Sequence, residues 1–170
     1  EESLNYSLGA VLRFGDFNVT VDGYRIDIDD RIVLSENLTQ ANVRAYLQGQ
    51  GFVGVGGGRF FINGVDTETQ GVDIVANYNM PETDFGKFGF TFGANFSKTD
   101  VTRVPAIPVL AALTPAPELF SRVNILTLEK GQPKDKFTFG VTWEMGDFSA
   151  GARAIRYGEI LVPGTTAALD

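Results

Sequence analysis

The feature that most constrains the fold of this chain is an alternation of apolar and polar residues that returns about six times. In residues 88–97 every second residue is Phe or Ala, and Gly, Thr, Asn and Ser stand between them. The same period of two runs through residues 4–14, 17–28, 71–78, 136–145 and 148–154. Because successive side chains of a strand point to opposite faces, this period predicts about six amphipathic strands and an all-β chain.

The connections between these segments alternate between short and long. Gly15-Asp16, residues 81–84 and Gly146-Asp147 are short, whereas residues 34–58 and 104–135 are long loops. Short turns at one end and long loops at the other are typical of transmembrane β-barrels, whose strands run up and down. The pattern predicts an antiparallel up-and-down meander of about six long strands, with the long loops on the outer side.

Aromatic residues gather near the short turns. They are Phe14, Phe17, Tyr78, Phe85, Phe88, Trp143 and Phe148. If the turns line one rim of a barrel, these rings form a belt at one membrane interface, where amphipathic rings are favoured. The other face of the strands mixes small residues with charges, as the wet interior of a barrel does.

Composition excludes several classes of protein. The chain is 44% hydrophobic, yet its mean hydropathy is only +0.01, and no stretch approaches the roughly 20 apolar residues of a membrane-spanning helix. A net charge of −7 argues against a nucleic-acid partner. The absence of cysteine excludes a disulfide framework and a zinc–thiolate site, and we expect no cofactor.

The alternation changes phase once, at Asp22-Gly23. Within the segment 17–28, the apolar residues before this point are Phe17, Val19 and Val21, and those after it are Tyr24, Ile26 and Ile28. A glycine at a change of phase indicates either a β-bulge or a strand that passes from one environment to another. The sequence leaves both alternatives open.

The two long loops contain helical patterns. Residues 37–50 predict a short helix, with Asn37 or Thr39 as a capping residue at its start and Gly49 at its end. Residues 118–128 predict another turn or two of helix.

Four strings resemble the barrel domain of TonB-dependent outer-membrane receptors. They are VTVDGYRIDIDDRI at 19–32, FFINGVDTETQGVD at 60–73, GQPKDK at 131–136 and RYG at 156–158. The resemblance covers nearly the whole chain and implies part of a barrel of about 22 strands, closed by a separate plug. It further implies a location in the outer membrane of a Gram-negative bacterium. The expected partners are membrane lipid, the TonB complex (through the plug) and a scarce nutrient such as a ferric siderophore, cobalamin or a sugar.

The ends of the chain lead us to expect a segment of such a barrel across residues 1–170. The chain opens on Glu1-Glu2 without a leader, ends in a loop-like sequence and lacks the plug and the terminal aromatic strand of the family. An isolated copy would keep two open strand edges and an apolar face. We therefore expect it to self-associate or to hold detergent.

Candidate ligand-binding residues lie where the first long loop returns to a strand. Arg59, Phe61 and Asn63 stand beside Phe60 at this point, and a ligand arriving from outside would meet them. An arginine suits an anionic chelate. The competing interpretation is loop-packing aromatics beside a solvated charge.

Other candidate sites are weaker. Gly49 to Gly54 matches Gly-x-Gly-x-x-Gly, but it follows a predicted helix, whereas a dinucleotide site follows a strand and opens a helix. Asp27, Asp29 and Asp30 offer carboxylates to calcium, although a solvated strand end is the simpler interpretation. Without histidine or cysteine an outer-membrane enzyme is disfavoured. A structural or adhesive surface sheet remains the rival class, and its outer face would need to be polar.

Overall fold

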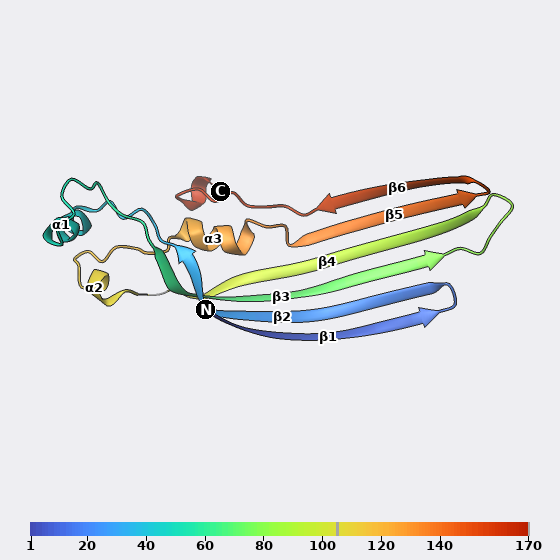
Figure 1. Ribbon diagram of the computed structural model, residues 1–170, viewed down its shortest axis with the longest axis horizontal. Helices are drawn as coiled ribbons and strands as arrows, with labels where there is room; N and C mark the ends of the chain where they lie inside the picture. Colours follow the sequence, from blue (N-terminus) through green and yellow to red (C-terminus); the bar gives the residue numbers. More distant parts are fainter. Residues whose placement is uncertain (105, 170) are drawn as a thin grey trace.

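The computed structural model describes residues 1–104 and 106–169 and contains one six-stranded sheet, with its helices gathered beyond one end (Figure 1). The strands are β1 (Glu2–Phe14), β2 (Phe17–Leu34), β3 (Phe61–Asn79), β4 (Lys87–Arg103), β5 (Asp135–Met145) and β6 (Phe148–Tyr157). The helices are α1 (Ala41–Gly49), α2 (Pro108–Ala111), α3 (Arg122–Lys130) and the 3₁₀ turn η1 (Ala167–Leu169). No helix in the described part of the chain is long and apolar enough to span a membrane.

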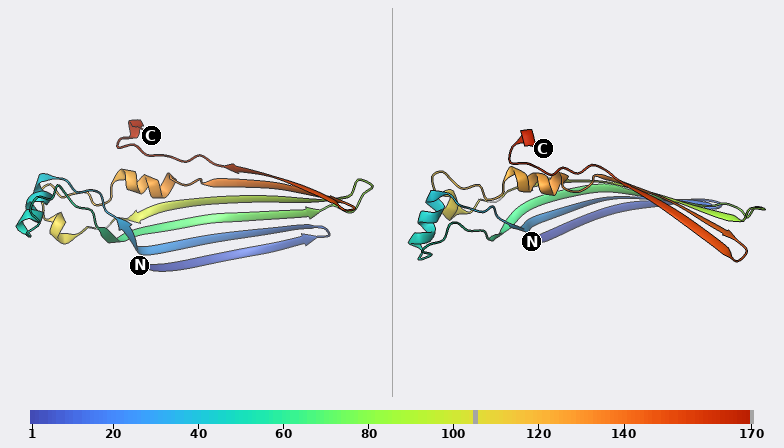
Figure 2. Two further views of the ribbon diagram at one scale, coloured as in Figure 1. Left: turned by 45° about the horizontal axis from the view of Figure 1, so that its top comes forward. Right: turned by 90° about the horizontal axis from the view of Figure 1, so that it is seen from above.

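The sheet is an antiparallel meander in which each strand pairs with its neighbours in sequence, in the order β1-β2-β3-β4-β5-β6. The predicted fold class and all six predicted strands are confirmed. The views of Figure 2 show one curved and twisted layer rather than two packed sheets. The curvature follows from the right-handed twist of the individual strands.

The register assigns every strand residue to one of two faces, since residues opposite each other in a pair share a face. Phe88 lies opposite Trp143, Phe90 opposite Val141 and Phe92 opposite Phe139. We call their side the phenylalanine face and the other side, which carries Thr91 and Thr138, the threonine face. The predicted shared face of the β4 and β5 aromatics is confirmed.

Two of the short turns are built on the same sequence. Gly15 and Gly146 each have φ of +58° and each precede an aspartate. This left-handed backbone is inexpensive only for glycine and a few polar residues, so these two-residue turns fix the hairpins β1–β2 and β5–β6. The β3–β4 turn is longer and contains Phe85.

Helices form in both long loops, with starts that differ from the prediction. Helix α1 ends at Gly49 as expected, but it begins after Gln40, and neither Asn37 nor Thr39 caps it. Its first turn is instead supported by the Asn42 carboxamide oxygen, which accepts a hydrogen bond from the amide of Val43. Helix α3 begins four residues later than the predicted 118, and α2 was not predicted because its four residues are too short to show a period.

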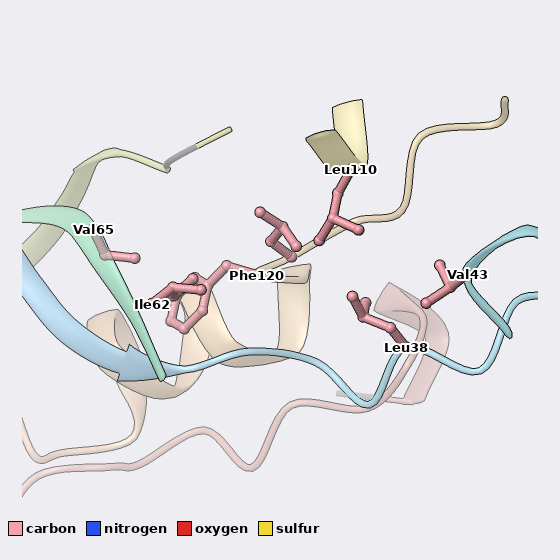
Figure 3. Close-up of a cluster of buried hydrophobic side chains, with 7 residues drawn as sticks. Leu38, Val43, Ile62, Val65, Leu110 and Phe120 are labelled. Carbon is pink, nitrogen blue, oxygen red and sulfur yellow. The ribbon is translucent and has the colours of Figure 1, made fainter. Parts of the chain in front are cut away.

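The two long loops, residues 35–60 and 106–134, pack together into one unit that we call the cap. Leu38, Val43, Leu110, Leu119 and Phe120 of the cap form one buried core with Ile62 and Val65 of β3, drawn in Figure 3. Val101 packs against this core, and it lies opposite Thr67 on the threonine face. The end of the sheet that carries the long loops is called its upper end, and the end with the short turns its lower end. The cap therefore covers the upper part of the threonine face and leaves the phenylalanine face open.

The phase change at Asp22-Gly23 is not a bulge. Pairing runs unbroken there, with Gly23 opposite both Leu8 and Val72. Tyr24, Ile26 and Ile28 consequently lie on the threonine face, and Arg25 and Asp27 lie on the phenylalanine face. The strand passes from one environment to another, which was the second of the two predicted alternatives. The irregularities of β2 pairing lie higher, on either side of Arg31.

Candidate functional site

The lower phenylalanine face is a continuous apolar surface. Across β2 to β5 it carries Val19, Val21, Val72, Ile74, Phe90, Phe92, Phe96, Phe137, Phe139 and Val141. From Phe88 to Phe96 it extends roughly 26 Å along β4 at about 3.3 Å per residue. Transmembrane barrels present an apolar band about 25 Å tall to lipid, and at a strand tilt of about 35–45° this length along β4 covers roughly 20 Å of that height.

Aromatic rings mark the lower edge of this band. Phe17 contacts Tyr78 with ring centroids 6.5 Å apart, and Tyr78 stacks on Phe90 at 6.3 Å. The indole N–H of Trp143 donates to the backbone oxygen of Phe85 at 2.7 Å. The predicted aromatic belt thus occupies one face beside the short turns, and the polar atom of its tryptophan is satisfied.

The turns are staggered along the sheet. The register carries Phe17, at the β1–β2 turn, across to Tyr78, Phe90 and Val141, whereas β5 continues four residues beyond Val141 to its own turn. With strands about 4.8 Å apart, this descent of about 13 Å over the four strand spacings between the β1–β2 and β5–β6 turns corresponds to a tilt of roughly 35°. Strands of transmembrane barrels tilt by about 35–45°, so the stagger is the one that a closed barrel requires.

Ion pairs lie directly above the apolar band on the same face. Arg25 pairs with Asp27 at 3.0 Å and with Glu68 at 2.8 Å, Lys98 pairs with Asp100 at 2.7 Å, and Arg156 pairs with Asp135 at 3.0 Å. Charges of this density are costly in hydrocarbon. They therefore place the upper boundary of the lipid-facing band between Phe96 and Lys98 on β4.

A further charged group holds the bend where β2 and β3 leave the wall. Arg103 donates to Asp66 and to Asp30, and Asp30 has φ of +53°. Hydrogen bonds from Arg103 hold the pKa of Asp66, which lies beyond the lipid-facing band, below its ordinary value. The amide of Asp30 also donates to Asp66, at 2.9 Å. The cluster fixes the strained residue and with it the direction of the outer strand ends.

The lower threonine face is polar and internally hydrogen-bonded. Thr91 donates to the Asn77 side-chain oxygen at 3.0 Å, and the Asn95 amide donates to Asp73. Small side chains predominate between them, as at Gly89, Gly93 and Gly140. Such a surface suits a wet lumen.

The cap is held together by polar contacts as well as by its core. The Glu36 carboxylate accepts hydrogen bonds from Ser121 and from Asn124, and its amide donates to the Leu119 oxygen at 2.9 Å. Asn42 of the first loop donates to the Pro115 oxygen of the second at 2.7 Å. The two loops are therefore joined at several points. These residues were missed from the sequence because their partners are 73 or more positions away.

The candidate ligand-binding residues lie at the base of the cap. The Arg59 guanidinium donates to the Ser35 backbone oxygen at 3.1 Å. Phe61 is 75% exposed, and Asn63 is exposed beside it on the side opposite the buried Ile62. The structure brings Phe61 and Asn63 onto one face and ties Arg59 to the loop, and a role for the three in ligand binding stays a prediction.

The weaker candidate sites do not assemble. Asp27 is paired with Arg25 and Asp30 with Arg103, and no group of three acidic, His or Cys residues in the described part of the chain is placed to hold a metal ion. The segment from Gly49 to Gly54 follows helix α1 and opens no helix of its own.

This geometry defines a class of protein: the wall of a transmembrane β-barrel, with lipid on the phenylalanine face and the lumen on the threonine face. Residues 1–168 match the family model described as TonB dependent receptor-like, beta-barrel, and the chain belongs to this family. No curated protein and no solved structure matches the chain significantly. The family consists of receptors and transporters of the Gram-negative outer membrane, which agrees with the resemblance seen in the sequence.

Proposed function

We propose that this chain forms wall, outer loops and part of the lumen in a receptor that imports a scarce nutrient with energy from TonB. The supporting observation is the position of the cap, which lies on the lumen side of the wall above the lipid-facing band. Loops in this position meet a ligand before it enters the lumen. A ferric siderophore, cobalamin or a sugar is the expected class of cargo, because the family serves such nutrients.

The ligand is proposed to contact Arg59, Phe61 and Asn63. Phe61 and Asn63 are exposed at the outer end of β3, and the bond from Arg59 to Ser35 uses one of five guanidinium N–H groups. The remaining donors are available to an anionic chelate. An adhesive sheet would carry no broad apolar band on its outer face, so adhesion is not the function we favour.

The test is uptake of labelled nutrients by Gram-negative cells that produce the complete protein. We expect accumulation of one class among ferric chelates, cobalamin and oligosaccharides, and its loss when a protonophore removes the inner-membrane energy supply. Arg59→Gln and Asn63→Ala should raise the half-saturating concentration, whereas Lys136→Gln, a charge change on the lumen wall, should not. Accumulation that persists without energy, or no accumulation of any class, would contradict the proposal.

A further inference from the structure

The cap contains a cavity between its two loops, formed by helices α1 and α2. Its volume is about 250 Å³, and it is lined by Val43, Tyr46 and Leu47 of α1, by Val109 and Leu110 of α2, and by neighbours such as Phe60. The Tyr46 hydroxyl is the one polar side-chain group among the lining residues. Figure 3 shows Leu38 and Val43 on one side and Leu110 approaching from the other.

Hydrogen bonds at and around the cavity wall hold it open. Asn42, next to Val43, is bonded to the Pro115 oxygen beyond α2. Leu38 and Gly58 form an isolated antiparallel bridge at the base of the first loop, and Glu36 joins that loop to α3. These contacts fix the two helices relative to each other without filling the space between them. The cavity is therefore a preformed feature of the cap.

The lining determines what the cavity accepts. Apolar cavities of about 150 Å³ remain dry and bind aromatic molecules of the size of benzene. A charged or hydroxyl-rich group would lose its water and find no partners in return. The volume and the aromatic side chains of Tyr46 and Phe60 suit one uncharged ring system or a short alkyl chain.

We propose that this cavity binds an uncharged aromatic or short alkyl group of the imported nutrient and thereby selects among nutrients at the outer surface. The inference rests on the proposed uptake function, since it names a chemical group of the cargo. Val109 is 50% exposed, so the cavity is reached from the outside of the cap without disturbing its core. Ring-bearing chelates would be retained by the cap, and plain sugars would not.

The experiment measures binding of 6-fluoroindole, an uncharged ring, to the complete protein in lipid nanodiscs by ¹⁹F NMR, with empty nanodiscs as the blank. We expect saturable binding that Val109→Trp weakens at least tenfold by occupying the cavity mouth. Val53→Trp is the matched control, because Val53 is 84% exposed and does not line the cavity; this variant should bind as the wild type does. Glucose should not displace the probe.

A second variant tests for a gain of binding, which a misfolded cap could not produce. Leu47→Ala enlarges the cavity and should improve binding of the larger 1-fluoronaphthalene relative to 6-fluoroindole. Absence of saturable binding to the wild type, or equal binding by Val109→Trp and Val53→Trp, would overturn the inference. The probe assay needs no TonB energy. Probe binding without nutrient uptake would therefore contradict only the proposed function. Nutrient uptake without probe binding would contradict only the cavity assignment.

Discussion

The strands carry opposite assignments of polarity in the wall and where the cap packs against them. Below Asp22-Gly23 the phenylalanine face is apolar and the threonine face is polar. Above it, ion pairs occupy the phenylalanine face, and Tyr24, Ile26, Val65 and Val101 occupy the threonine face. Along a single strand, the apolar side chains therefore move from the face that contacts lipid to the face that contacts the cap core.

The largest expected effect compares one substitution in both regions. Phe120 is 5% exposed in the cap core, and Phe120→Ala should cost roughly 3–5 kcal/mol because it removes buried contacts and leaves a cavity. Phe139→Ala on the lipid face should cost about 1.5–3 kcal/mol, since lipid chains fill the space. Hydrogen exchange should show the first loss confined to residues 35–60 and 106–134 and to the end of β3 that carries Ile62 and Val65. A loss spread over β1–β6 would mean that the cap does not unfold separately from the wall.

A charge introduced on either face of the wall tests which face meets lipid. Phe92→Arg should lower the free energy of unfolding by roughly 2–4 kcal/mol if the site lies near mid-bilayer. Thr91→Arg, one residue away on the lumen face, should cost mainly its hydrogen bond to Asn77, about 1 kcal/mol. Denaturant titration of the complete protein in lipid measures both. Equal penalties would mean that the faces are assigned wrongly.

The bend between wall and cap should depend on pH. Because the pKa of Asp66 is lowered in the folded state, its stabilising contribution is present above the ordinary carboxylate range and is lost as pH falls through the folded-state pKa. A spin label at Phe61→Cys, in a chain without other cysteines, should therefore become more mobile in acid. Arg103→Gln should make the label mobile already at neutral pH. A pH response unchanged by that substitution would exclude the Arg103–Asp66 pair as its cause.

The smallest expected effect separates two threonines on one face of β3. Thr67 is 3% exposed, and its hydroxyl has no hydrogen-bond partner among the described residues, whereas the Thr69 hydroxyl is bonded to that of Thr99 at 2.9 Å. Thr67→Val should leave stability equal or slightly higher, and Thr69→Val should lower it by about 0.5–1.5 kcal/mol. Calorimetry of both variants measures which of them is the less stable. If Thr67→Val were the less stable variant, the hydroxyl without a hydrogen-bond partner would belong to Thr69 instead.

The wall was predictable from the sequence because its information is local. The period of two in residues 88–97 and the Gly-Asp turns at 15 and 146 act between neighbouring strands. The cap was not predictable, since Glu36 finds Asn124 and Asn42 finds Pro115 only after the fold has formed. The phase change at Gly23 was visible, but its meaning depended on which face the loops cover.

Pairing between sequence neighbours alone also implies an order of assembly. The hairpins β1–β2, β3–β4 and β5–β6 each close a short segment of chain, which costs little entropy and proceeds quickly. The contacts of the cap join residues 73 to 88 positions apart, an expensive closure for a free chain. Once β2, β3, β4 and β5 are paired, both loops are already tethered at the same end of the sheet. We therefore expect the wall to form first and the cap to follow as the last event of folding.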